Sequence, residues 1–529
     1  MRHRTGLLLL LLVGALLRLP TFSRPLLSDD EAIYAATADA MAEGNVLYRD
    51  VVDHKPPAIY FIYRAGMALF GPHNTQGAHL FVVLAVLATA ALLFAIGRAG
   101  WGRGPEALTA AGLFLVFSTT WHDYDALAAN CELFLLLPQA AAAWIALRPG
   151  DDSPAARVAR AFGVGVLIGV SALCKYQGVT FLGATAALLW FDRVHTRATT
   201  KAGEGAFRRA VLAAVGVLPE VALQLVGVAV PAALYLAYAA GVGALDATLF
   251  WFRFNFLYVD AGLTGGEALV RGLSRLGMIG AAALPVYLCG VAEAASLLRR
   301  WLRRSEPAIG RHECFLLAWL LTSVIALSAG GRFFGHYFHL VLAPLAVLAA
   351  PRCVRLWRRS RGVRLFLVAA TAVPAFGFFA LATFARPLAE RIDEAEPPYN
   401  PVAHAIAANT GADETIFVWG NSPQLYSLAR RSMGTRFSFC NYMTGESPGT
   451  ATQTGAKSAD DNSLAISWQM LFDDLETRKP ALFVDAAAAG WDGYDKFPIT
   501  RYPRLLEYLR VRYRLISEVA GVRLYRISP

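Results

Sequence analysis

The chain has 529 residues, of which 56% are hydrophobic and only 17% are charged. A soluble protein usually carries charge on about a quarter of its residues, so this composition excludes an ordinary soluble enzyme and indicates a polytopic helical membrane protein. The formal net charge of +10 does not indicate nucleic-acid binding, because the basic residues lie in short segments between apolar runs, as in cytoplasmic loops.

The first apolar run, residues 6–20, follows the basic sequence Met-Arg-His-Arg. Arg18, Pro20 and Arg24 stand where a signal peptide would have a small-residue cleavage site. We therefore expect an uncleaved first helix with a cytoplasmic N-terminus.

Apolar segments recur along most of the chain and predict about eleven membrane spans. They lie near residues 6–23, 78–97, 106–120, 131–147, 159–173, 177–191, 213–240, 276–298, 313–329, 337–350 and 365–385. Counted from a cytoplasmic N-terminus, every Arg-rich loop falls inside and every acidic or aromatic loop falls outside. The predicted fold class is mainly α, a transmembrane helical bundle over residues 1–385 whose first outer loop is 24–77.

The composition changes after the last span, where residues 386–529 become more polar. "TIFVWG", "ALFVDAA" and "GVRLYRI" are typical of buried strands, and "SLAISWQMLFDDLETR" and "RYPRLLEYLRVRY" are typical of amphipathic helices. Strands that alternate with helices predict a small α/β domain outside the membrane.

The first outer loop contains an unusual density of ionisable residues. Ser28 can cap a helix whose first turn holds Asp29, Asp30 and Glu31, and acids at a helix N-terminus complement the helix dipole. The dipole accounts for one or two of them. The following "AIYAATADAM" has an apolar face suited to the membrane interface, and "LYRDVVDHKPP" then adds two aspartates, a histidine and a lysine before the chain re-enters the membrane. This concentration favours a functional site over a plain capped helix.

These motifs resemble the first periplasmic loop of membrane-embedded GT-C glycosyltransferases, especially bacterial relatives of protein O-mannosyltransferases and of the lipid A aminoarabinose transferase. The matching residues are Asp30-Glu31-x-x-Tyr34, Gly44-x-x-x-Tyr48-x-Asp50 and Lys55-Pro56-Pro57. Further resembling segments follow in the same order, at residues 169–178, 250–259, 330–350 and 414–431.

The resemblance implies transfer of a sugar from a polyprenyl-phosphate donor to an acceptor hydroxyl at the outer face of a bacterial cytoplasmic membrane. Asp30 matches the catalytic aspartate and would act as general base, with inversion by direct displacement. Glu31 would support it by orienting the acceptor or a cation, and Asp29, one position earlier, would rank behind Asp30 as a substrate-binding candidate. The resemblance leaves the sugar and the acceptor (lipid, glycan or protein) open.

Cations should surround the departing lipid phosphate. Lys55, Lys175 and Arg332 lie at predicted outer membrane ends and could meet it, although snorkelling at the interface is the alternative for each. His336 and Tyr337 could bind phosphate or sugar hydroxyls, but an interfacial tyrosine is common.

Other candidate substrate-binding residues come from both of the first two outer loops. Glu132 begins an apolar span, where an ionisable group is costly and usually functional, and it follows Asp123 and Asp125 in the second outer loop. The remaining candidates are Tyr34, Tyr48, Asp50 and His54.

A metal is unresolved at this stage. Asp30, Glu31 and His54 could together hold a divalent cation, which prefers oxygen ligands, but no dedicated metal-binding spacing is present. No nucleotide-binding motif occurs, which fits a lipid-linked donor.

Two other classes of function compete with an enzyme. A transporter or flippase of a lipid-linked glycan would also need basic residues near a phosphate, but it should show repeats, broken helices and charges deep within its spans. The charges here gather in the outer loops, which favours the enzyme. A ligand sensor anchored by its membrane part would leave both the many spans and the first loop unexplained.

Overall fold

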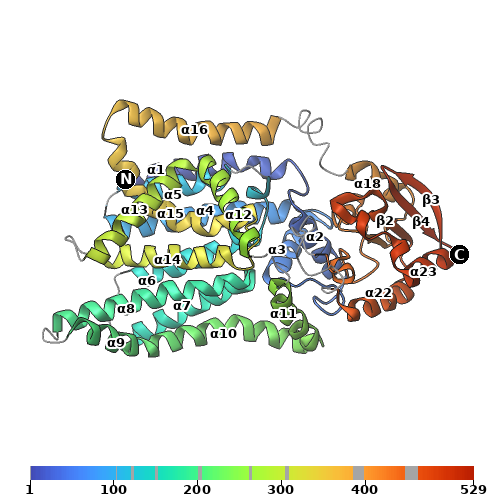
Figure 1. Cartoon of the computed structure of the whole chain (residues 1–529), viewed down its shortest axis with the longest axis horizontal. Helices are drawn as coiled ribbons and strands as arrows, with labels where there is room; N and C mark the ends of the chain where they lie inside the picture. The colour runs from blue at the N-terminus through green and yellow to red at the C-terminus, as the bar shows by residue number, and fades with distance from the viewer. Residues whose placement is uncertain are drawn as a thin grey trace.

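The computed structural model describes residues 2–102, 104–120, 124–148, 153–200, 205–260, 265–303, 309–384, 398–446 and 463–529. A helical body occupies one end of the long axis and a smaller mixed domain the other end, with α2, α3 and α11 between them (Figure 1). The N-terminus lies at the end of the body farthest from this outer domain (Figure 1).

The helices of the body follow one another with short connections. They are α1 (Arg2–Leu17), α2 (Asp29–Ala42), α3 (Ala58–Phe70), α4 (Gln76–Trp101), α5 (Gly104–Phe117), α6 (Cys131–Leu147), α7 (Pro154–Cys174), α8 (Phe181–Thr200), α9 (Ala206–Gly216), α10 (Leu218–Gly241), α11 (Leu245–Asp260), α12 (Gly265–Ala282), α13 (Leu284–Arg303), α14 (Arg311–Ser328), α15 (His339–Trp357) and α16 (Arg361–Phe384). Short 3-10 turns connect some of them, including η2 (Tyr124–Ala126), η3 (Tyr176–Thr180) and η4 (Gly335–Phe338).

Among the described residues, seven helices are long and apolar enough to cross a membrane, and the bent pair α12 and α13 would make an eighth. The shorter apolar helices α3, α5 and α6 add to them. Helix α15 is buried over most of its length in the middle of the bundle, whereas α1, α10 and α16 expose large apolar side chains. Such exposure suits helices that face lipid.

One predicted span is wrong as a single straight helix. Residues 276–298 cross the junction between α12 and α13, where the helix direction bends by 112°. Pro285 lies at the start of α13, where it has no backbone N–H to continue the hydrogen-bond ladder of α12.

Helix α2 does not lie exposed at the interface, contrary to the sequence expectation. It is buried from Glu31 to Met41 and packs against α3 and against α19 (Gln424–Ala429) of the outer domain. Alanines dominate its sequence, and their small side chains allow neighbours to approach closely from several directions.

The outer domain contains a four-stranded sheet in the order β1-β2-β4-β3. Strands β1 (Ile416–Trp419) and β2 (Leu482–Asp485) are parallel, and β4 (Val522–Ile527) runs antiparallel to both β2 and β3 (Tyr513–Val519). Its helices are α18 (Tyr399–Ala408), α19 (Gln424–Ala429), α20 (Asn441–Thr444), α22 (Ala465–Arg478) and α23 (Pro503–Arg512). The predicted boundary at residue 386 lies outside the described residues.

The edge strand β3 was missed from the sequence. Its sequence YRLISEV mixes polar and apolar residues without strict alternation, and most of them are partly or fully exposed, so no continuous apolar run marks it. Pairing with β4 supplies the hydrogen bonds that its sequence pattern does not reveal.

Candidate active site

The N-terminus of α2 points its three acids in three directions. Ser28 Oγ accepts a hydrogen bond from Glu31 N and caps the helix. Successive residues of an α-helix are rotated by about 100°, because each turn holds 3.6 residues. Asp29 therefore meets Gln424 of the outer domain at 2.5 Å, Glu31 enters the bundle, and Asp30 faces the space between them.

Asp30 forms an ion pair with Lys55, whose Nζ lies 2.7 Å from Asp30 Oδ1. The Tyr34 hydroxyl donates to the other carboxylate oxygen at 3.3 Å, and the Lys55 ammonium lies 4.6 Å from the centre of the Tyr34 ring. Burial disfavours the charged form of Asp30, but Lys55 and His336 outweigh it and lower the pKa of Asp30 to about 2. The side chain is still 28% exposed, so an ionised carboxylate is open to approach.

The loop before α3 holds Lys55 by its backbone. The Tyr48 hydroxyl donates to the Lys55 carbonyl at 2.5 Å, and Tyr48 itself adopts a φ of 70°, in the left-handed region that is uncommon for a bulky residue. Asp50 is used within the same loop, where it accepts from Val46 N at 2.9 Å and pairs with Arg49. The geometry thus makes Tyr48 and Asp50 supports of the loop.

A second group of charges lies beside Asp30. His336 Nδ1 lies 2.5 Å from Asp125 Oδ2, and His336 Nε2 lies 3.8 Å from both Asp30 Oδ2 and Glu132 Oε1. Burial of Asp125 opposes its ionisation, but His336 outweighs this and lowers the pKa of that carboxyl. His336 therefore joins three carboxylates from three separate segments of the chain.

Glu132 and Lys175 close the cluster on its inner side. Lys175 Nζ pairs with Glu132, which is almost fully buried, and lies 3.7 Å from the centre of the Tyr337 ring. The predicted residues that the structure brings together are Asp30, Tyr34, Lys55, Glu132, Lys175, His336 and Tyr337. Lysines and a histidine thus balance the carboxylates, and an incoming anion could compete for their positive charge.

Arg332 is almost fully buried and has basic neighbours on α12. The charges of Arg275 and Arg332 both act on Arg271, and the Arg271 guanidinium lies 5.5 Å from the centre of the Phe334 ring. Phe334 in turn stacks on His336 with ring centres 5.8 Å apart. This arginine patch, defined as residues 271, 275 and 332, therefore lies one aromatic ring away from the cluster.

Known proteins share the fold of this chain. Residues 54–222, less than half of the chain, match the family described as dolichyl-phosphate-mannose-protein mannosyltransferase. ArnT from Cupriavidus metallidurans bound to undecaprenyl phosphate has a similar structure, with a TM-score of 0.59 and 16% identity over 98% of this chain and 97% of that one. The chain has the GT-C fold.

A second group of similar structures comes from an archaeon. The Archaeoglobus fulgidus oligosaccharyltransferase AglB, in complex with an inhibitory peptide and a dolichol-phosphate, gives a TM-score of 0.53 at 14% identity, covering 100% of this chain and 74% of that one. No curated protein matches the sequence. The predicted fold class, a multi-pass helical bundle with a small C-terminal α/β domain, is thereby confirmed.

Glu31 has a different environment from Asp30 in this GT-C fold. It is fully buried, accepts hydrogen bonds from Leu27 N at 2.7 Å and Ala129 N at 2.6 Å, and lies 3.1 Å from His79 Nε2. These contacts connect α2, α4 and the segment before α6. Glu31 therefore holds these three segments together at the buried side of the site, which favours a positioning role over contact with substrate.

The residues considered as cation ligands do not converge. Asp30 faces Lys55, Glu31 faces His79, and His54 contacts the neighbouring Asp53 instead. In the part of the chain that the structure describes, no group of three or more His, Cys, Asp or Glu residues could hold a metal ion.

Sequence reasoning gave no role to several residues around the site. In the sequence, Asp125 and Asp53 are only further acids of the outer loops, and no motif singles out Arg271, Arg275 or Tyr442. Asp125 follows Asp123, which lies outside the described residues, and only its contact with His336 distinguishes it. Arg332 of the arginine patch is a candidate from the sequence, and the spacing of Arg271 and Arg275 on α12 could have marked the other two members.

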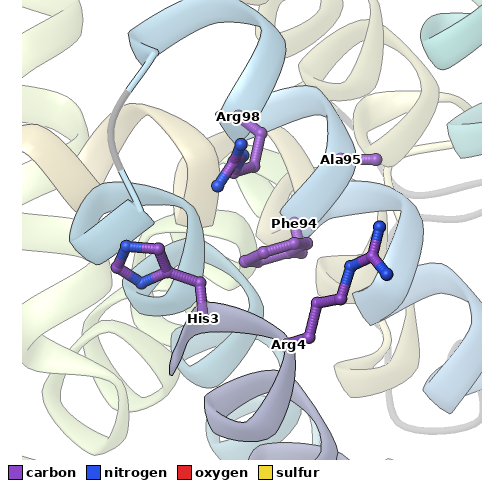
Figure 2. Close-up of a pocket in the computed structure, with 5 residues that line it drawn as sticks. All are labelled: His3, Arg4, Phe94, Ala95 and Arg98. Atoms are coloured by element: carbon purple, nitrogen blue, oxygen red, sulfur yellow. The ribbon is translucent and has the colours of Figure 1, made fainter. Parts of the chain in front are cut away.

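A separate pocket lies near the N-terminus of the chain (Figure 2). It has a volume of about 400 Å³ and is lined by His3, Arg4, Phe94, Ala95 and Arg98. His79, at the site, and Arg98, at this pocket, belong to the same helix α4, and a rise of 1.5 Å per residue separates them by about 30 Å. The pocket and the charged cluster therefore lie near opposite ends of the bundle.

Proposed function

We propose that this protein is a glycosyltransferase that moves a sugar from a polyprenyl-phosphate donor to an acceptor hydroxyl. The observation that carries the proposal is the contact between Asp30 and Lys55 at the exposed edge of a balanced charge cluster. The fold supports it, because the similar ArnT structure is bound to undecaprenyl phosphate and the similar AglB structure to a dolichol-phosphate.

Asp30 is the general base in this proposal. An acceptor hydroxyl is a weak nucleophile, and an ionised carboxylate within hydrogen-bond reach can take its proton. Lys55 keeps Asp30 ionised before substrate arrives, but a carboxylate with a pKa of about 2 is a weak base. A donor phosphate that draws the Lys55 charge toward itself would raise the pKa of Asp30 and so strengthen the base.

The leaving lipid phosphate needs positive charge nearby. Lys55 and Lys175 would supply it on the cluster side, and the arginine patch would supply it next to Phe334. With one base and no covalent nucleophile assigned, the acceptor displaces the phosphate directly, so the sugar inverts its configuration. Asp125, Glu132 and His336 would then line the sugar or acceptor side.

We place the reaction at the outer face of a bacterial cytoplasmic membrane, with the N-terminus in the cytoplasm and the outer domain outside. The positive-inside rule supports this orientation, because Arg4 and Arg98 lie together at the pocket near the N-terminus. The acidic turn of α2 contacts the outer domain instead, where Asp29 meets Gln424. The acceptor could be a lipid, a glycan or a protein.

The test is a transfer assay with purified protein in lipid and a panel of polyprenyl-phosphate sugars, with an envelope extract as acceptor. Transfer of one sugar by the wild type supports the proposal and identifies the donor. Tight binding of the donor lipid without any transfer would support the rival function, a transporter of lipid-linked glycans. The bent pair α12 and α13 is a feature that a transporter would share.

A further inference from the structure

Asp53 is a fully buried carboxylate next to the site, and it has no part in the proposed chemistry. It accepts hydrogen bonds from His54 N at 2.6 Å, from the Tyr60 hydroxyl at 2.6 Å and from the Tyr442 hydroxyl at 3.2 Å, and His54 Nδ1 lies 2.9 Å away. A buried charge is costly unless it is paired and hydrogen-bonded, and here both carboxylate oxygens are occupied. Asp53 therefore holds His54, Tyr60 and Tyr442 in place through its hydrogen bonds.

The donors to Asp53 come from separate parts of the molecule. Tyr60 belongs to α3 of the helical body, whereas Tyr442 belongs to α20 of the outer domain, 389 residues away from Asp53. The Tyr442 ring is held independently by edge contacts with Trp251 at 4.9 Å and Phe254 at 5.3 Å, both on α11. The hydroxyl is thus presented to Asp53 by a packed aromatic ring.

A short backbone pairing reinforces this junction. Val52 N donates to Arg436 O at 2.8 Å, and Val52 forms a parallel bridge with Phe437. Arg436 is held in turn by Asp474 of the outer domain at 2.8 Å. The residue immediately before Asp53 is therefore also fixed by the outer domain.

The constraint continues along the chain to Lys55. His54 Nδ1 contacts the Tyr442 hydroxyl at 3.2 Å, and the His54 carbonyl accepts from Asn255 of α11. One residue later, Lys55 reaches Asp30 at 2.7 Å. Small displacements of a group that contacts a substrate can cost large factors in rate, so the position of this loop matters for function.

We propose that the outer domain contributes a positioning residue to the site. Tyr442, acting through Asp53 and His54, positions Lys55 opposite Asp30. This inference rests on the proposed function. Tyr442 and Asp53 are positioning residues in it and do not touch the reacting atoms. Loss of the Tyr442 hydroxyl should loosen the ion pair between Lys55 and Asp30 while the outer domain stays folded.

The variant Tyr442→Phe removes the hydroxyl and keeps the ring that packs on Trp251 and Phe254. The matched control is Tyr513→Phe, which also removes a buried hydroxyl of the outer domain, one that donates to Pro480 O at 2.8 Å. Each variant removes one buried tyrosine hydroxyl of the outer domain and keeps the ring, so Tyr513→Phe reports how far the loss of such a hydroxyl weakens the domain in general. Thermal unfolding of both variants checks this.

The decisive readout is the pH profile of kcat/KM for transfer, which reports groups of the free enzyme. Lys55 lowers the pKa of Asp30, so loosening it should move the acid limb to higher pH, by about one unit in Tyr442→Phe. Asp53→Asn should produce the same shift, and the double variant should add little, since both act through one contact. Tyr513→Phe should leave the limb in place.

An unshifted acid limb in Tyr442→Phe, or a shift equal to that of Tyr513→Phe, overturns the inference and leaves the proposed function standing. Additive shifts in the double variant also overturn it, because independent effects would then be at work. If the wild type neither transfers a sugar nor binds undecaprenyl phosphate, the proposed function and this inference fail together. If the wild type binds that lipid without transfer, an affinity lowered in Tyr442→Phe alone supports the positioning of Lys55, and an affinity equal to that of Tyr513→Phe overturns it.

Discussion

Lys55 Nζ meets Asp30 Oδ1 at 2.7 Å across 25 residues of sequence, and this ion pair joins the loop before α3 to the first turn of α2. Tyr34 supports both partners, through its hydroxyl to Asp30 and its ring beneath Lys55. The pair combines a carboxylate that can accept a proton with a cation that can meet a phosphate. Its chemistry, and that of the charges around it, can be tested by substitution.

Removing the Lys55 charge should change the pH dependence of the reaction. In Lys55→Met, the pKa of Asp30 should rise from about 2, because burial then acts without its main opposing charge. The acid limb of kcat/KM should move to higher pH, and the affinity for undecaprenyl phosphate should fall by about tenfold or more. An acid limb that stays in place would separate Lys55 from Asp30 in function.

The buried pair of Glu132 and Lys175 should show strong coupling in stability. Glu132→Gln or Lys175→Met alone leaves one buried charge without its partner, which typically costs about 3–5 kcal/mol. The double variant removes both charges and should recover most of the thermal stability, measured in detergent, but not the transfer activity. Additive losses of stability in the double variant would contradict a direct pair.

The arginine patch should act on donor binding. Arg271→Ala and Arg275→Ala should each raise the KM for the donor, by about three- to tenfold, because each removes one charge that could attract the lipid phosphate. Arg359→Ala is the control, since Arg359 is an exposed arginine that follows the end of α15. Equal effects of all three substitutions on KM would show a general loss of positive charge.

Removing divalent cations should leave transfer largely intact. The positive charge near Asp30 comes from Lys55, Lys175 and His336, and these can take the role that a metal ion would fill in stabilising a leaving phosphate. We expect the rate with EDTA to stay within about twofold of the rate without it. A loss of activity that added Mg²⁺ or Mn²⁺ restores would contradict this.

Local patterns in the sequence predict the main parts of the candidate site. The capped acidic turn at Asp29 to Glu31 and the His-Lys-Pro-Pro stretch are recognisable from a few adjacent residues. The membrane spans follow from apolar runs, because a helix must satisfy its own backbone hydrogen bonds in lipid. The sequence marks Lys55 and Asp30 as separate candidates, but no pattern in it predicts that the two form an ion pair.

Long-range contacts explain what sequence reasoning missed. Glu31 and Asp30 are adjacent in the sequence but differ in their surroundings. The packing of α4 and of the segment before α6 against α2 buries the Glu31 carboxylate and leaves that of Asp30 partly exposed. The role that we propose for Asp53 depends on its hydrogen bond from Tyr442, which belongs to the outer domain. No local pattern contains that information.

The central claim is that Asp30 is the general base of a sugar transfer. The most direct measurement compares wild type with Asp30→Asn in lipid, using the donor found active and a parallel assay of undecaprenyl phosphate binding. Asp473→Asn, an exposed aspartate of α22, is the matched control. We predict that Asp30→Asn loses transfer by about 10²–10⁴-fold while it still binds the lipid, and that Asp473→Asn behaves as wild type. Transfer by Asp30→Asn at the wild-type rate would contradict the account.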